Sequence, residues 1–367
     1  MKIPYIQLGV QHKELKREIL TNIETLLDNG QFILGDETLK FETQFAKLCE
    51  TNHALGVGNG TDTMILSMRA LGIGVGDEVI TAPNSYLASA SSIALTGATP
   101  VFADVCEDYN INPVEIEKKI TAKTKAIIPV HLTGRPADMD AIMAIAKKHN
   151  LFVIEDCAQA IGARYKNKAV GSFGNTGSFS LHPLKNLGAC GDGGMITTND
   201  NSLFNYLSKA RTHGHSSRDE VDFWSFNTRL DNLQATILNV KIQKIEEWNN
   251  RRREIAAMYY EGLKNLPILY LPKDNANQHS VYHTFIIQVD KRNELMEYLA
   301  KHGVDTKIHY PIPIHLQKAA QSLGYKKGDF PVTEKQCETI LSLPIYPQLT
   351  NEEIEYIIEN ITNFYRL

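Results

Sequence analysis

Short apolar runs alternate with helical patterns through most of the chain, and this alternation limits the possible folds more than any other feature. The run Leu151–Ile154 is continuously apolar, which is typical of a strand buried on both faces of a parallel sheet. The preceding residues, Asp138 to His149, carry apolar side chains at helical spacing. Strands covered by helices in this way predict an α/β fold with a mainly parallel central sheet. Further strands are expected at residues 54–57, 78–81, 100–103, 125–130, 177–181 and 195–198.

The pattern changes near Leu233, and this change indicates a second domain. From there to Met258, apolar residues recur at steps of three and four between charged ones, which predicts one long amphipathic helix. A strand over His283–Val289 and a helix over Glu294–His302 follow it. A chain of 367 residues has room for two or three units of about 150 residues. We therefore predict a large domain over residues 1–250 and a small C-terminal α+β domain over residues 251–367.

Charge and cysteine content exclude several classes of protein. Lysine plus arginine number 38 and aspartate plus glutamate 42, so the basic excess typical of a nucleic-acid-binding surface is missing. No apolar run reaches the ~20 residues that cross a bilayer, and the first residues lack a signal-peptide core. Five scattered cysteines without a CxxC pair are typical of reduced thiols, and the 12 histidines show no zinc-ligand spacing. We expect a cytoplasmic protein without a metal, a nucleic-acid partner or a membrane partner.

A glycine-rich turn, Gly58-Asn59-Gly60-Thr61, follows the first predicted strand and opens a helix. Free N–H groups at such a helix start favour an anion. A dinucleotide-binding fingerprint needs a third glycine, but position 63 is Thr63, and no Lys-Ser/Thr pair of a nucleotide P-loop follows. The turn therefore suits a single phosphate, although by itself it is equally well read as a tight turn without a ligand.

Two further residues give this turn a chemical context. Asp156 follows the buried run at the carboxyl end of its strand, the edge where open α/β sheets bind ligands. Lys185 stands five positions after Ser180, in an apolar turn that precedes more glycines. Burial lowers the pKa of a lysine and leaves a nucleophilic amine that can form a Schiff base. A carboxylate, an amine and a phosphate-binding turn are the three partners that pyridoxal phosphate needs.

With these residues in place, the chain resembles the DegT/DnrJ/StrS aminotransferases. These are pyridoxal-phosphate enzymes of the fold-type I, aspartate aminotransferase-like superfamily, and they aminate keto sugars on nucleotide carriers. The resemblance runs nearly end to end, and it implies that superfamily's architecture of a large domain and a small C-terminal domain. It is carried by the segments Gly72–Ile80, Pro129–Asp140, Ile154–Ala163, Ser178–Gly194, Phe226–Ala235, His309–Gln317 and Ser342–Pro347.

The resemblance implies roles around the cofactor ring. Lys185 is expected to bind the aldehyde and to move the proton during transfer, and Asp156 to pair with the pyridine nitrogen. Gln159 is expected near the ring and its 3-hydroxyl group. Tyr86 occupies the position whose aromatic ring stacks on the cofactor.

The resemblance also implies contacts to the phosphate, to the substrate and to a second subunit. Asn227 matches an asparagine that reaches the phosphate bound by the partner, so a homodimer with a shared active site is expected. The phosphate contacts are expected from Gly60, Thr61, the main chain of Asp62, and Ser180. Substrate contacts are expected from Arg229, His309 and Tyr310.

The activity implied by the resemblance is transfer of an amino group from L-glutamate to a 3- or 4-keto group of a nucleotide-linked deoxysugar. Such a reaction serves deoxyamino-sugar and surface-polysaccharide synthesis, and Gln159 with the residues after Lys185 favours the 3-keto position. Related sugar dehydratases have a histidine in place of this lysine, so Lys185 argues against them. Two alternatives remain open: a smaller phosphorylated ketone as acceptor, or a non-catalytic sensor or assembly protein that keeps the fold.

Overall fold

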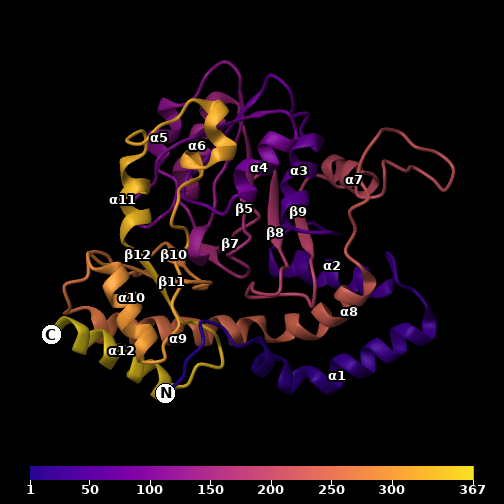
Figure 1. Cartoon of the computed structure of the whole chain (residues 1–367). Coiled ribbons are helices and arrows are strands. Elements are labelled where there is room, and N and C mark those ends of the chain that lie inside the picture. The colour runs from indigo at the N-terminus through magenta and orange to yellow at the C-terminus, as the bar shows by residue number, and fades with distance from the viewer. Residues whose placement is uncertain (367) are drawn as a thin grey trace.

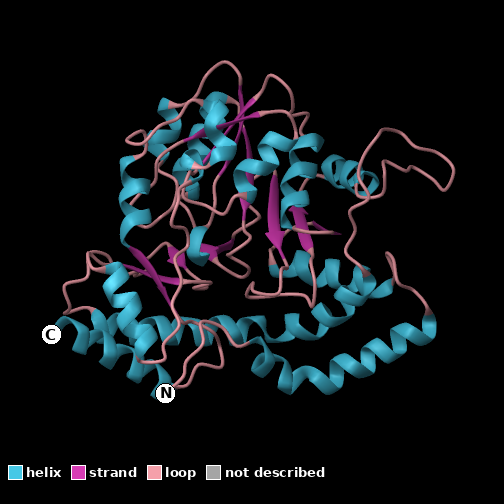
Figure 2. Ribbon diagram, viewed as in Figure 1, coloured by secondary structure: helices cyan, strands magenta, loops and turns pink. Residues whose placement is uncertain are grey.

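The computed structural model describes residues 1–366, and a seven-stranded sheet forms the centre of the larger part. The strand order is β1-β9-β8-β5-β4-β2-β3, and β9 alone runs antiparallel to the other six strands. The predicted α/β class with a mainly parallel sheet is confirmed (Figures 1 and 2). The strands are β1 His53–Val57, β2 Glu78–Thr81, β3 Thr99–Phe102, β4 Thr124–Ile128, β5 Phe152–Asp156, β8 Thr176–Ser180 and β9 Gly194–Thr198.

Apolar side chains on both faces of the central strands explain why these strands read as continuous apolar runs. Ile154 of β5 packs with helices α3 (Gly60–Ala70) and α4 (Ala88–Leu95), whereas its neighbour Val153 packs with α6 (Met139–His149) on the opposite face. Successive strand residues point to opposite faces, so both must be apolar when helices cover both sides. The remaining helices of this part are α2 Asp36–Leu48, α5 Pro113–Lys118 and α7 Asn201–Ala210.

The long helix predicted from Leu233 to Met258 is interrupted. Helix α8 (Asn232–Lys241) ends in a 3₁₀ turn over Ile242–Lys244, and α9 (Ile245–Leu263) begins directly after it. Ile242 and Ile245 stay buried across the turn. A 3₁₀ turn repeats every three residues, so it preserves the apolar spacing that the sequence shows, and periodicity alone cannot reveal the break.

Helix α1 (Leu8–Asn29) lies along α8, as Figure 1 shows, and covers it with Leu15 and Ile19. The second half of α9 leaves this layer and enters a separate core. That core contains an antiparallel pair of strands, β11 (Phe285–Gln288) and β12 (Ile340–Leu343). It is covered by α10 (Arg292–Lys301) and α12 (Asn351–Arg366).

Packing crosses the predicted domain boundary in both directions. Ile3 lies in the C-terminal core and bridges to Val304, whereas Ile314 and Phe330 pack against Phe102 of β3. The division at residue 250 therefore stays a prediction. The connecting elements are α11 Pro331–Thr339 and the three short strands β6 Arg164–Tyr165, β7 Lys168–Ala169 and β10 Gln278–His279. Among residues 1–366, no helix combines the length and the apolar character that crossing a membrane requires.

Candidate active site

The carboxyl ends of β5 and β8 bring Asp156 and Ser180 to one edge of the sheet. The two strands are parallel neighbours, and Asp156 pairs in register with Ser178. The turn after β8 carries Lys185, whose N–H donates to the carbonyl of His182 at 2.8 Å. Asp156 and Lys185, the predicted carboxylate and amine of the site, therefore come from the ends of two adjacent strands.

Lys185 has an amine suited to nucleophilic chemistry near neutral pH. The residue is half-buried, and desolvation lowers the pKa of its ammonium group to about 8, although the nearby Asp156 carboxylate raises it. A neutral amine is the nucleophilic form of lysine, and a lowered pKa increases its population.

Asp156 is buried and is held by two hydrogen-bond donors. The hydroxyl of Ser89 donates to Oδ2 at 2.8 Å, and the N–H of Ala158 donates to Oδ1 at 3.1 Å. The hydroxyl of Ser85 lies 2.8 Å from that of Ser89 and extends the network. Donors of this kind fix the orientation of a carboxylate. Ser89 was not predicted, because no local motif marks a serine on α4 as a neighbour of β5.

The glycine-rich turn packs tightly against Ser180. A Cβ atom added at Gly60 would lie 2.7 Å from the Cβ of Ser180, so the turn accommodates only glycine there. Gly60 and Thr61 are the first two residues of α3, where N–H groups have no acceptor within the helix. This approach places two free N–H groups near the Ser180 hydroxyl, which is a suitable arrangement for a phosphate.

Asp62 has a different set of contacts from the expected one. Its N–H donates to Oδ1 of Asn59 at 2.9 Å, so the main-chain donor assigned to the phosphate already has a partner. Its carboxylate accepts from the hydroxyl of Thr228 and from the amide of Asn59. The Thr228 hydroxyl in turn accepts from the N–H of Gly58 at 2.9 Å. Thr228 fastens the turn to the segment before α8, a long-range contact that the sequence does not reveal.

Aromatic and amide side chains of the predicted site gather near Tyr310. Tyr86 is 59% exposed, and its ring centroid lies 5.8 Å from that of Tyr310. Gln159 is buried, and its Oε1 accepts from the N–H of Thr133 at 2.8 Å. Burial raises the pKa of Tyr310, and the neighbouring Tyr86 and Asp156 raise it further. Tyr86, Gln159 and Asp156 thus all lie near Tyr310.

Two histidines beside Lys185 are held neutral. Burial lowers the pKa of His309 to about 4, and the positive charges of Lys185 and Lys307 lower it further. Its Nδ1 lies 2.9 Å from the hydroxyl of Ser342. Burial and the charge of Lys185 also hold the pKa of His283 well below its ordinary value. His309 was predicted here, whereas His283 was missed because its sequence position indicated only a strand.

Asn227 and Arg229 are not joined to the other site residues. Asn227 is exposed and Arg229 half-buried, and within residues 1–366 neither side chain forms a hydrogen bond or an ion pair. Both lie near the end of the long connection between α7 and α8, whose loop extends away from the body of the molecule in Figure 1. Trp224 of this loop is 90% exposed and Phe226 is 41% exposed.

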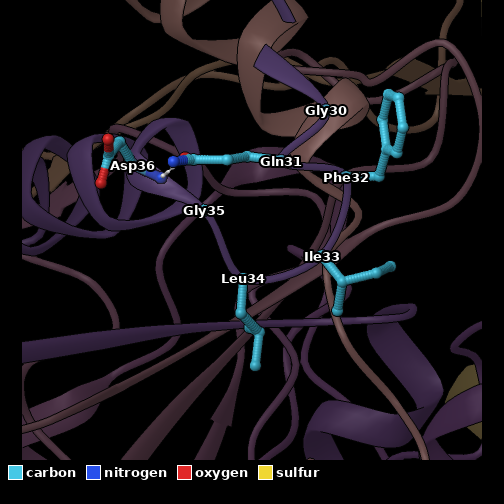
Figure 3. Close-up of a pocket in the computed structure, with 7 residues that line it drawn as sticks. All are labelled: Gly30, Gln31, Phe32, Ile33, Leu34, Gly35 and Asp36. Carbon is cyan, nitrogen blue, oxygen red and sulfur yellow. Dashed lines mark hydrogen bonds between the residues drawn. The ribbon is translucent and has the colours of Figure 1, made fainter. Parts of the chain in front are cut away.

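A surface hollow lies in the connection between α1 and α2, lined by residues 30–36 (Figure 3). Phe32 and Ile33 are each 48% exposed, and Leu34 is 38% exposed. Figure 3 shows Ile33 and Leu34 pointing to one side of the segment and Phe32 to the other. Three consecutive exposed apolar side chains are typical of a surface that a partner covers.

A buried group of His131, Glu155 and Cys157 has potential metal-ligand atoms within 4.8 Å of one another. His131 and Glu155 already have hydrogen-bond partners. Glu155 accepts from the N–H groups of Gly171, Phe173 and Gly174 and lies 3.1 Å from Nε2 of His131, whose Nδ1 accepts from Ala137. The group therefore has a structural explanation, and the expectation of no metal stays a prediction.

The arrangement fits pyridoxal 5′-phosphate. It combines an amine with a lowered pKa, a buried carboxylate with two fixed donors, and a turn whose glycine leaves no room for a Cβ atom. These groups match an aldehyde, a ring nitrogen and a phosphate, respectively.

The model of the DegT/DnrJ/EryC1/StrS aminotransferase family matches residues 13–362. The chain belongs to this family. The predicted family and the prediction of an aminotransferase are thereby confirmed.

Curated relatives match over almost their whole length. The dTDP-3-amino-3,6-dideoxy-alpha-D-galactopyranose transaminase of Aneurinibacillus thermoaerophilus is 45% identical, with 99% of each chain covered. A protein of Geobacillus stearothermophilus named pleiotropic regulatory protein is 44% identical over 100% of this chain and 99% of its own.

Solved structures of aminotransferases have the same fold. DesV of S. venezuelae is 39% identical and has a TM-score of 0.98, with 100% of this chain and 99% of that chain covered. NtdA of Bacillus subtilis, solved with bound cofactor PMP, is 30% identical with a TM-score of 0.93, over 100% and 86% of the two chains. The predicted aspartate aminotransferase-like fold is confirmed.

Proposed function

We propose that this aminotransferase transfers an amino group from L-glutamate to a keto group of a nucleotide-linked deoxysugar. The observation that carries the proposal is the placement of Lys185 beside Asp156 at adjacent strand ends. The name of the Aneurinibacillus relative, which is 45% identical, supports the substrate class. The same name describes a 3-amino sugar, which supports the 3-keto position over the 4-keto position.

The cofactor is pyridoxal 5′-phosphate, as the family and the PMP-bound NtdA indicate. When bound, it supplies an electron sink that stabilises the carbanion formed at the substrate carbon. Lys185 would hold its aldehyde, and Asp156 would pair with its ring nitrogen. The N–H groups of Gly60 and Thr61 and the hydroxyl of Ser180 would hold its phosphate, with Tyr86 against its ring.

Different side chains of the protein are then expected to have different roles in the reaction. The amine of Lys185, with a pKa of about 8, can accept and return a proton near neutral pH, which suits general acid–base catalysis. The hydroxyl of Ser89 and the N–H of Ala158 hold the Asp156 carboxylate in a fixed orientation. His309 is neutral, so it can contact a sugar hydroxyl as donor or acceptor without adding a charge beside Lys185.

The direct test is an assay of the purified protein with pyridoxal 5′-phosphate, L-glutamate and a panel of acceptors. The panel contains 3-keto and 4-keto deoxysugars on dTDP and UDP, together with small phosphorylated ketones. We expect an amino sugar by mass spectrometry and equimolar 2-oxoglutarate with a 3-keto nucleotide sugar. If the protein binds the cofactor but glutamate never converts that cofactor to its amino form, the protein would instead be a sensor, in line with the name of the Geobacillus relative.

We propose that two copies share each active site. Two observations support this: Asn227 presents an exposed, unpartnered amide within residues 1–366, and apolar side chains are exposed nearby and at residues 32–34. Exposed apolar surface of this kind is typical of a protein interface. In the dimer, Asn227 would reach the partner's phosphate site, and Arg229 would contact the substrate there.

We also propose that the protein works in the cytoplasm. All five cysteines are free thiols, and Cys49, Cys157 and Cys337 are buried. Buried reduced thiols are typical of a reducing compartment. Mass spectrometry after alkylation of freshly lysed cells tests this: free thiols at all five positions are expected, and a native disulfide would contradict the proposal.

A further inference from the structure

Thr228 stands between Asn227 and Arg229 in the sequence, yet its side chain contacts the phosphate-binding turn of its own subunit. Its hydroxyl accepts from the N–H of Gly58 at 2.9 Å and donates to the carboxylate of Asp62. The contact is close, because a Cβ atom added at Gly58 would lie 2.8 Å from Oγ1 of Thr228. One buried hydroxyl therefore connects the start of the turn to helix α3, which follows it.

Residues 227–230 alternate between a more exposed and a buried side chain. Thr228 is 5% exposed and Leu230 is 1% exposed. Asn227 is exposed and Arg229 is half-buried. Asn227 forms an antiparallel β-bridge, so the backbone here is extended, and successive side chains of extended backbone point in opposite directions. Because Thr228 is fixed against the turn, the directions of Asn227 and Arg229 are fixed with it.

A second contact ties the same backbone to the strand that leads into the turn. The carbonyl of Arg211 accepts from the N–H of Thr228 at 3.0 Å, and the Arg211 guanidinium donates to the carbonyl of Gly56 at 3.0 Å. Gly56 lies in β1, two residues before the turn. Arg211 also pairs with the buried carboxylate of Glu42. Residues 227–230 are therefore held by both the strand and the turn of their own subunit.

We propose that Thr228 is a positioning residue that couples the two active sites of a dimer. Its hydroxyl fixes Asn227 and Arg229, the residues proposed to serve the partner's site, relative to the phosphate-binding turn of their own subunit. Thr228 acts through these two neighbours and is assigned no contact with cofactor or substrate. This inference rests on the proposed function, because it adds a residue to the shared site proposed there.

The coupling follows from the geometry of hydrogen bonds. A hydrogen bond weakens steeply when its donor moves or tilts. The Asn227 amide can hold a phosphate across the interface at full strength only if its backbone is held still, and the Thr228 hydroxyl contributes the neighbouring side-chain contact. Loosening Thr228 in one subunit should therefore weaken cofactor binding in the other subunit, whose own residues are unchanged.

Mixed dimers isolate this effect across the interface. One subunit has Lys185→Ala, so its own site cannot hold the cofactor aldehyde. The other has Asn227→Ala, so its site keeps Lys185 and receives an intact Asn227 from the first subunit. Two different affinity tags isolate the mixed dimer. Thr228→Val is then added to the Lys185→Ala subunit, and the absorbance of cofactor bound to Lys185 gives the dissociation constant for pyridoxal 5′-phosphate.

Thr228→Val keeps the shape of the side chain and removes its hydroxyl. It should weaken cofactor binding at the partner's site about threefold or more, the range of substitutions that act through a connected network. Thr228→Ser keeps the hydroxyl and should restore the affinity of the parent mixed dimer. Thr212→Val is the matched control: the Thr212 hydroxyl contacts only the carbonyl of Lys209, so affinity should change less than about twofold.

Asp62→Ala breaks the same link from the side of helix α3, and it is the second variant if thermal melting shows that Thr228→Val does not fold. Placed in the Lys185→Ala subunit, it should also weaken binding at the partner's site about threefold or more. An unchanged affinity in the folded mixed dimer overturns the inference. An equal loss with Thr212→Val, or no recovery with Thr228→Ser, overturns it as well.

The parent mixed dimer, with Thr228 intact, shows whether the site is shared at all. If each subunit used its own Asn227, this dimer would bind the cofactor no better than the Asn227→Ala homodimer. Failure of the shared site is thus seen before any change at Thr228, and failure of the coupling only after it. The measurement uses neither amino donor nor keto sugar, so it stands whichever acceptor the enzyme aminates.

Discussion

The hydroxyl of Ser89 lies 2.8 Å from Oδ2 of Asp156 and ties helix α4 to the end of strand β5. This contact, together with the N–H of Ala158 at Oδ1, leaves the carboxylate little freedom to rotate. A carboxylate that must face one ring nitrogen needs such support, because the strength of that interaction depends on the orientation of the carboxylate as much as on its charge. Ser89 is therefore a positioning residue for Asp156.

Ser89→Ala should weaken cofactor binding about tenfold, because a hydrogen bond to a charged group contributes about 1.5–3 kcal/mol. Titration of the apoprotein with pyridoxal 5′-phosphate, followed by visible absorbance, gives the dissociation constant. Ser91→Ala is the matched control, since the Ser91 hydroxyl contacts only the Ala88 carbonyl of the same helix. Equal constants for both variants would show that Ser89 does not support the site.

Gly60→Ala should abolish high-affinity cofactor binding while the protein still folds. The new Cβ atom would lie 2.7 Å from that of Ser180, so the phosphate-binding turn must move. Gly9→Ala on α1 is the control: no atom lies within 4 Å of its new Cβ atom, and a helical alanine should stabilise the fold by about 0.5–1 kcal/mol. Normal cofactor affinity in Gly60→Ala would remove this turn from the site.

The reactivity of Lys185 in the apoprotein should rise as the pH passes through about 8, because burial favours the neutral amine. Competitive labelling with acetic anhydride, read by mass spectrometry, measures this midpoint. Asp156→Asn should shift the midpoint to lower pH, since the carboxylate raises the pKa of Lys185. Lys264 is the control: its hydrogen bond to Glu261 raises its pKa, so it should label only at higher pH. A shift to higher pH in Asp156→Asn would contradict the arrangement.

Mixed dimers test whether the site is shared. A Lys185→Ala subunit and an Asn227→Ala subunit, each inactive alone, should form one intact site when they combine. Random mixing should then restore about a quarter of wild-type activity, because half of the dimers have one working site of two. Activity that stays at the sum of the two separate variants would show that each subunit uses its own Asn227.

The sequence predicted the features that depend on local pattern. The apolar run before Asp156 and the turn at Gly60 revealed a strand and its following helix, because burial on two faces and a tight turn both leave local signals. Contacts between distant segments leave no such signal. Ser89 and Thr228 have their roles only because the fold brings separate elements together.

The break between α8 and α9 illustrates a second limit. Ile242 and Ile245 continue the apolar spacing through a 3₁₀ turn, so the helix appeared uninterrupted in the sequence. The antiparallel direction of β9 was equally invisible, since a buried strand is apolar in either direction. The helix break and the strand direction both depend on how elements pack together, and the residue pattern within one element does not indicate that packing.

The most direct test of the account is to identify the lysine that binds pyridoxal 5′-phosphate. Reduction of the loaded protein with borohydride, followed by peptide mass spectrometry, fixes the cofactor to its lysine. Lys241 is an internal comparison, because burial also lowers its pKa to about 8, but its amine donates to the carbonyl of Gly188. We predict the phosphopyridoxyl group on Lys185 alone. Its presence on Lys241, or on no single lysine, would contradict the account.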